Sequence, residues 1–139
     1  MAVAVGSLLL ALAVPTYGRI VDRLKVSTAT QDLMRIAQEL QRYRTAHDFK
    51  LPDSLGELTG IPRQDPWHND YQYLNFASNV PGINGLIRKD HNLHPLNSEF
   101  DLYSKGPDGD SSAPLTSSPS RDDVIWARDG SFVGKAEDF

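Results

Sequence analysis

Apolar residues are unevenly distributed along the chain, and the densest run lies at its beginning. Residues 1–14 are apolar except for Gly6 and Ser7. After Pro15 and Gly18 the apolar positions recur at spacings of three and four residues. This spacing is typical of an amphipathic helix with one buried face. The stripe comprises Ile20, Leu24, Leu33, Ile36, Ala37, Leu40 and Tyr43.

The two patterns together predict one long N-terminal helix. A proline inside a helix removes a hydrogen bond and bends the axis, so we expect a kink near Pro15. The residue before a proline disfavours helix, so the amphipathic half should end near His47, ahead of Leu51-Pro52. We therefore divide the chain into an apolar membrane or filament-core segment, residues 1–26, and a globular head, residues 27–139, which includes the second half of the helix.

The apolar run has three interpretations. As a helix it would span about 21 Å, which is less than the roughly 30 Å of a bilayer core. It could be a signal peptide with a cleavage site at Ala11-Leu12-Ala13, a buried core helix, or the end of a longer apolar helix that starts upstream of Met1. The third is favoured, because no basic residues precede the run and the helical pattern continues beyond the cleavage site.

The sequence pattern changes after Pro52, where short apolar segments alternate with turn-forming residues. Residues 53–58 are typical of a capped helical turn, with Asp53 or Ser54 as the N-cap. Long loops are expected at residues 79–97 and 105–121, which are rich in Gly, Pro, Asn, Asp and Ser. A small sheet needs cover on its face, and the apolar stripe of the long helix would provide it, so we predict an α+β fold. Four short antiparallel strands are expected at residues 71–76, 100–104, 124–127 and 131–133.

Charge and cysteine content narrow the functional classes. Residues 1–50 carry seven basic and four acidic residues, whereas residues 51–139 carry seven basic and fourteen acidic ones. An acidic head argues against nucleic acid as a partner, because phosphate binding needs clustered Lys and Arg. The basic residues Arg19, Arg23 and Lys25 follow the apolar run and suit anionic lipid head groups. The chain has no cysteine, so a small head would need a staple other than a disulfide, such as a metal ion.

No motif in the sequence indicates catalysis, because the G-x-S-x-G, H-E-x-x-H, Walker and Rossmann patterns do not occur. We therefore expect a protein that is not an enzyme. Trp67 and Tyr71 are interpreted as residues that close the core, with Asn69 and Asp70 shaping the turn between them. The histidines are interpreted as scattered surface side chains rather than metal ligands. They are His47, His68, His91 and His94.

Four aspartates flank a glycine-rich loop near the C-terminus. Calcium takes about six to eight oxygen ligands from carboxylates and carbonyls, and such a loop offers both. The spacing does not match an EF-hand, and composition alone favours a solvated acidic loop. The four are Asp108, Asp110, Asp122 and Asp123.

Three stretches, residues 8–17, residues 65–71, and residues 100–109 with residues 122–126, together resemble sequences of the type IV pilin-like proteins, and most of all those of the major pseudopilins of the type II secretion system. Residues 8–17 are similar to the apolar run that ends in Val-Pro and a small-aromatic pair. Residues 65–71 read D-P-W-H-N-D-Y, close to the family's D-P-W-G-N-D-Y. Residues 100–109, F-D-L-Y-S-K-G-P-D-G, followed by residues 122–126, D-D-V-I-W, resemble the final loop and strand.

The resemblance implies a structural subunit of a filament that supports protein export. The partners would be further copies of the chain, minor pseudopilins and other components of the secretion machine. The protein would sit in the bacterial inner membrane with a periplasmic head, and then in a periplasmic or cell-surface filament. Two alternatives remain: a type IV pilin for adhesion, motility or DNA uptake, and a secreted calcium-binding module.

The resemblance also implies a structural calcium ion in the final loop. The matching side chains are Asp108 and Asp122, followed by Asp123 and the carbonyls near Ser104 and Lys105. Such an ion would pin a loop that few apolar contacts hold, so a chelator should lower the melting temperature of the head.

The chain departs from the family in three places. Mature family members begin with a phenylalanine followed closely by a glutamate, after cleavage by the prepilin peptidase and methylation, and these residues would lie upstream of Met1. His68 stands where the family has a glycine. The stretches at residues 80–97 and 111–121 look longer than usual.

Overall fold

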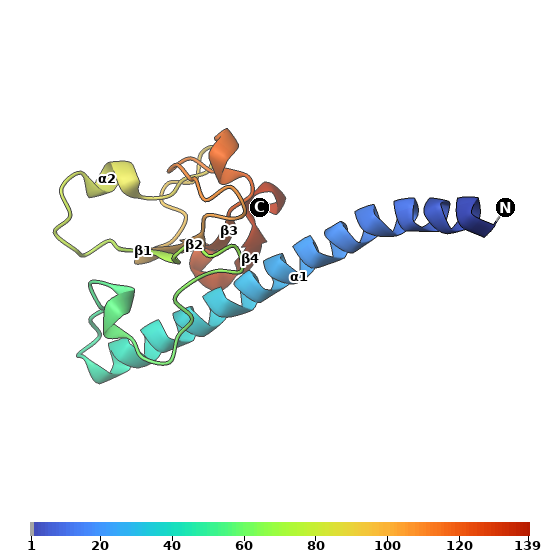
Figure 1. The fold of residues 1–139 in the computed structure, drawn as a ribbon. Helices are drawn as coiled ribbons and strands as arrows, with labels where there is room; N and C mark the ends of the chain where they lie inside the picture. The colour runs from blue at the N-terminus through green and yellow to red at the C-terminus, as the bar shows by residue number, and fades with distance from the viewer. Residues whose placement is uncertain (1) are drawn as a thin grey trace.

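A long helix and a small antiparallel sheet form the chain (Figure 1). The computed structural model describes the backbone of residues 2–139 and the side chains of Ala11 and residues 14–139. Helix α1, Ala2–Ala46, runs through Pro15 without a break, and its axis bends gently in the N-terminal third (Figure 1). The helix ends one residue before the predicted end at His47.

The sheet has four antiparallel strands in the order β1-β2-β3-β4, which confirms the predicted α+β fold. Residue pairs such as Leu102 with Trp126 and Ile125 with Gly134 set the register. The predicted capped turn is a 3-10 helix whose capping box joins Ser54 and Glu57. Helix α2, Ile83–Leu86, lies in a stretch predicted as loop. The strands are β1 Gln72–Asn75, β2 Phe100–Ser104, β3 Val124–Ala127 and β4 Phe132–Lys135. The capped 3-10 turn is Leu55–Glu57, and further 3-10 turns are Ser118–Ser120, Arg128–Gly130 and Ala136–Asp138.

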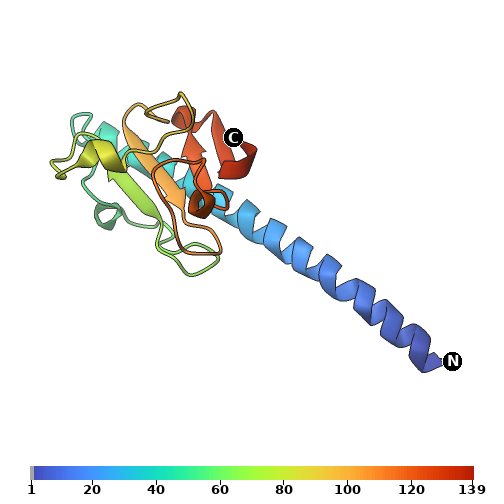
Figure 2. The same ribbon diagram turned by 90° about the horizontal axis from the view of Figure 1, so that it is seen from above.

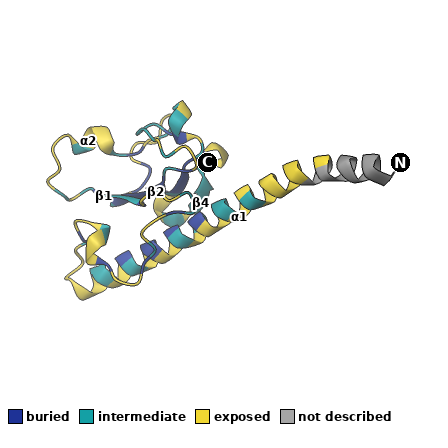
Figure 3. Cartoon of the chain, in the orientation of Figure 1, coloured by how far each residue is buried: buried dark blue, intermediate teal, exposed yellow. Residues whose placement is uncertain are grey.

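The main core lies between the second half of α1 and one face of the sheet. Side chains alternate between the faces of a strand, so Leu102 and Val124 point toward the helix while Tyr103 and Ile125 point away. The buried positions of α1 form a stripe on the side that faces the strands (Figure 3). The stripe consists of Ala29, Leu33, Ile36, Ala37 and Leu40.

Loops, rather than a second helical layer, cover the other face of the sheet. Figure 2 looks onto this face and shows the yellow and orange segments over the strands, with α1 behind them. These segments and the C-terminus form a smaller apolar cluster with Ile125. Its buried members are Leu96, Leu115, Ile125, Ala127 and Ala136.

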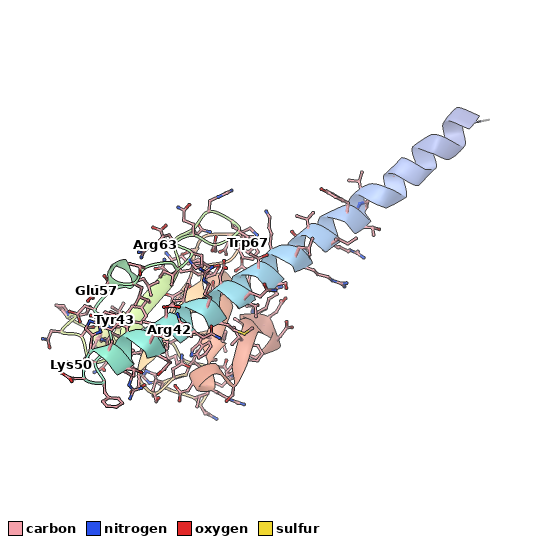
Figure 4. The ribbon with its side chains drawn as sticks, turned by 90° about the horizontal axis from the view of Figure 1, so that it is seen from below. Arg42, Tyr43, Lys50, Glu57, Arg63 and Trp67 are labelled. Atoms are coloured by element: carbon pink, nitrogen blue, oxygen red, sulfur yellow. The ribbon has the colours of Figure 1, made fainter. Side chains whose placement is uncertain are left out.

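The segment after α1 folds back along the end of the helix (Figure 4). The Tyr43 hydroxyl donates to a Glu57 carboxylate oxygen at 2.7 Å, which joins α1 to the 3-10 turn. The Arg63 guanidinium donates to the Leu58 carbonyl at 2.7 Å. The first contact holds the C-terminal end of α1 against the head, and the second stabilises the segment that follows the helix.

Candidate functional site

The first candidate site is the part of α1 that projects beyond the head, here called the stem, residues 2–28. At about 1.5 Å per residue it extends roughly 40 Å from the sheet (Figures 1 and 2). Large apolar side chains on the stem face solvent: Val14 is 69%, Tyr17 71%, Ile20 51% and Leu24 62% exposed.

The stem also carries basic side chains without ionic partners. Arg19 and Arg23 are exposed and Lys25 is half-buried. None of the three forms an ion pair with any residue that the structure describes. The stem therefore combines exposed apolar area with uncompensated positive charge.

The predicted membrane segment, residues 1–26, is described only in part, because most side chains of the apolar run lie outside the described residues. Across the helices that the structure describes, none combines the length and the apolar character that crossing a bilayer requires.

The second candidate site is the acidic loop, residues 105–123, where two of the predicted calcium ligands meet. The Asp108 amide donates to an Asp122 carboxylate oxygen at 3.2 Å. Burial raises the pKa of the Asp122 carboxyl, and the nearby charge of Asp108 adds to the effect. Gly106 has a positive φ of 65°, and a Cβ there would lie 2.3 Å from the Asp122 carbonyl oxygen. The close approach of the two loop ends therefore requires glycine at this position.

Ser104 is buried and already has hydrogen-bonding partners. Its hydroxyl donates to Asp65 Oδ2 at 2.5 Å and accepts from the Gly106 amide at 3.0 Å. Asp65 also accepts from the amides of Trp67 and Asn69, at 3.0 and 2.9 Å. Asp65 therefore joins the turn before β1 to the start of the acidic loop. Sequence reasoning missed this role, although an aspartate that accepts from following backbone amides is a common turn device.

Asp123, the third predicted ligand side chain, is fully buried and lies in an ion pair. Its Oδ2 accepts from Arg88 Nη2 at 2.5 Å and from the Ser111 hydroxyl at 2.5 Å. Burial raises the pKa of Asp123 to about 6, against the opposing effects of Ser111 and Arg88. Sequence reasoning missed Arg88, which lies in a stretch predicted as loop.

The residues present fit a calcium ion only in part. The Asp108 amide contacts the Asp122 carboxylate, but Asp123 is paired with a guanidinium. Among the residues whose side chains are described, no three acidic or histidine side chains gather as a metal site. Lys105 is half-buried, and its backbone carbonyl belongs to the same turn. Calcium binding stays a prediction.

The aromatic pair before β1 belongs to the core, as predicted. Tyr71 is buried and Trp67 packs against the same cluster. The Tyr71 hydroxyl donates to Asp32 on α1 at 2.7 Å, which adds a polar tie between helix and head. The four histidines are all exposed; His91 and His94 share one loop, and His47 and His68 lie on other segments.

Comparison with known proteins gives one informative relative. Type II secretion system core protein G of Pseudomonas aeruginosa is 31% identical over 128 residues, and the match covers 77% of each chain. The chain belongs to the core protein G family, the major pseudopilins. No protein-family model and no solved structure matches it. In this pseudopilin, a helix that runs beyond a small antiparallel sheet is the arrangement that the structure describes.

Proposed function

We propose that this pseudopilin is a structural subunit of a type II secretion pseudopilus, and that it assembles with further copies of itself through the stem. Two observations support the proposal: membership of the core protein G family and the geometry of the stem. Its role is architectural, so we assign it no reaction.

The exposed apolar side chains of the stem carry the proposal. Among the described residues, Val14, Tyr17, Ile20 and Leu24 are exposed and belong to neither apolar cluster of the head. Association of several parallel stems would remove this area from water, at a gain of roughly 25 cal/mol per Å². The heads would then lie on the outside of a helical bundle.

The proposal extends to location and partners. Before assembly the apolar run would lie in the inner membrane, with Arg19, Arg23 and Lys25 near anionic head groups and the acidic head in the periplasm. The assembled filament would act with minor pseudopilins and other parts of the secretion machine to support protein export.

A pair of variants on adjacent turns of the stem tests the assembly. Leu24→Asp places a carboxylate in the exposed apolar surface, whereas Ser27→Asp places the same group at an exposed polar position. Leu24→Asp should abolish filaments in cells and block secretion, because a charge would be buried without a partner. Ser27→Asp should assemble.

Near-ultraviolet circular dichroism of the two purified full-length variants provides the control, since both heads should melt at the wild-type temperature. Filaments that form normally with Leu24→Asp would contradict the proposal. So would a full-length wild-type chain that stays monomeric without detergent and never forms fibres in cells.

A further inference from the structure

One cation is buried in the head, beneath the acidic loop. Arg88 lies between α2 and β2 and is 3% exposed. Among the Lys and Arg side chains that the structure describes, it alone is buried. Burying a guanidinium is costly unless it is paired, so its contacts indicate what it does.

The guanidinium is held by three side chains. Its Nη2 donates to Asp123 Oδ2 at 2.5 Å, and its Nη1 donates to the Ser111 hydroxyl. Ser111 in turn donates to the same oxygen of Asp123 at 2.5 Å. The guanidinium carbon lies 4.1 Å from the ring centroid of Tyr103, in cation–π contact.

Backbone contacts connect the segment around Arg88 to the sheet and to the acidic loop. The Arg88 amide donates to Asp101 Oδ2 on β2 at 2.7 Å. The Lys89 amide donates to the Ala113 carbonyl at 3.0 Å, and the Leu115 amide donates to the Lys89 carbonyl at 2.8 Å. Arg88 therefore sits where the two long loops and the sheet meet.

Two buried polar atoms of this group have no hydrogen-bond partner, Arg88 Nε and Asp123 Oδ1. They are a donor and an acceptor of the same ion pair, and a side-on guanidinium–carboxylate fork would join these two atoms. In the structure the guanidinium reaches Oδ2 alone, and Oδ1 has no hydrogen-bond partner among the described residues. A calcium ion on Asp123 would lie beside a like charge in a poorly solvated interior, where repulsion is strong.

We infer that Arg88 supplies, from the chain itself, the positive charge that the family resemblance assigns to calcium in the acidic loop, and that it fixes this loop to the sheet, so that the head needs no calcium ion for its stability. The inference concerns the folding of the head and does not depend on filament assembly.

Thermal unfolding of the full-length chain in detergent, with excess calcium chloride or with EGTA, tests this inference. Arg88→Met removes the charge and keeps the apolar part of the side chain, and Arg121→Met is the matched control at an exposed arginine of the acidic loop. Arg88→Met should lower the melting temperature by more than about 10 °C, because Asp123 is left buried without a cation. Arg121→Met should change it by less than about 4 °C.

Calcium should act differently on the two proteins. The wild type should melt within about 4 °C of the same temperature with calcium or EGTA, whereas calcium should partly rescue Arg88→Met by pairing with the freed Asp123. The double variant Arg88→Met/Asp123→Leu removes both charges, so it should regain most of the lost stability and show no rescue by calcium.

Two results would overturn the inference: a wild-type melting temperature that calcium raises by more than about 5 °C, or an Arg88→Met variant no less stable than Arg121→Met. If Arg88→Met fails to fold, the calcium dependence of the wild type and the folding of the double variant test the inference instead. A calcium-independent wild type with a folded double variant supports Arg88, and a calcium-dependent wild type refutes it.

Discussion

The two halves of helix α1 contain similar apolar residues in opposite surroundings. Ile20 and Leu24 of the stem are mostly exposed, whereas Ile36 and Leu33 of the second half are fully buried against the sheet. The backbone is the same continuous helix in both. The difference lies in what covers the apolar stripe, which in the head is the chain's own sheet.

Burial on α1 begins where the sheet begins to cover the helix. Among the side chains that the structure describes, Ala29 is the first that is fully buried, and Val26 is packed against the edge of the core. The head thus satisfies its own apolar surface and can fold on that basis, whereas the stem depends on surfaces outside the chain. Substitutions in the two halves should therefore affect different measurements.

The largest expected effect is a difference in head stability between truncations of a buried leucine, Leu33, and an exposed leucine, Leu24. Leu33→Ala should destabilise the head by about 2–5 kcal/mol, because it leaves a cavity between α1 and the sheet. Leu24→Ala should change head stability by less than about 0.5 kcal/mol, since an exposed side chain loses little on truncation. Thermal unfolding of the full-length chain, followed by the near-ultraviolet signal of the head, measures both. Equal losses from the two variants would mean that the stem folds against the head.

The next effect is a pH dependence of stability. It comes from a buried carboxyl in the head and should be absent from the stem. Asp101 is buried on β2, where it accepts from the Arg88 amide at 2.7 Å and from Asn97 Nδ2 at 3.2 Å. Burial raises the pKa of Asp101 to about 6, although these two donors and the charges of Arg88 and His94 act in the opposite direction. The folded head therefore favours the protonated acid.

The sign of the pH dependence follows from this shift. The pKa of Asp101 is higher in the folded than in the unfolded chain, so its contribution to stability is fully present below about pH 4 and is lost as the pH rises through about 6. A shift of about two units corresponds to about 3 kcal/mol. Melting curves from pH 4 to 7 should show a smaller decline for Asp101→Asn than for the wild type. A remaining decline is expected, because the raised pKa of Asp123 acts in the same direction. Parallel profiles for the two proteins would exclude this role for Asp101.

The helix and strands could be predicted from the sequence because each has a local pattern. The spacing from Leu33 to Leu40 and the alternation around Leu102 are set by neighbours in sequence, and the structure confirms both elements. The capped turn at Ser54 was readable for the same reason.

The polar contacts of the head had no such local signal. Arg88 and Asp123 are 35 residues apart, and Asp65 and Ser104 are 39 apart. Each pair joins segments whose approach is set by the sheet and its loops, which no periodicity in the sequence describes. The sequence therefore grouped Asp123 with exposed carboxylates, although the fold places it in a buried ion pair.

The smallest expected effect is a change in stability that comes from backbone strain at one turn of the head. An unstrained position in the stem provides the comparison. His68 is exposed and adopts a positive φ of 69°, a conformation that costs a residue with a Cβ roughly 1 kcal/mol or more. The turn holds it there, because its amide donates to the Asp65 carbonyl at 3.0 Å. His68→Gly should relieve this strain and stabilise the head by up to about 1 kcal/mol, less the added entropy of the unfolded chain.

Two matched variants sharpen this test. His68→Ala keeps a Cβ, so it should give no gain, and a gain equal to that of His68→Gly would mean that the imidazole, rather than the backbone, is the source of strain. Gly18→Ala is the counterpart in the stem, where a Cβ would meet no atom within 4 Å. Gly18→Ala should stabilise the helical conformation of the stem by about 1 kcal/mol, because alanine has the higher helix propensity. It should leave the melting of the head unchanged, because a Cβ at Gly18 would meet no atom of the head.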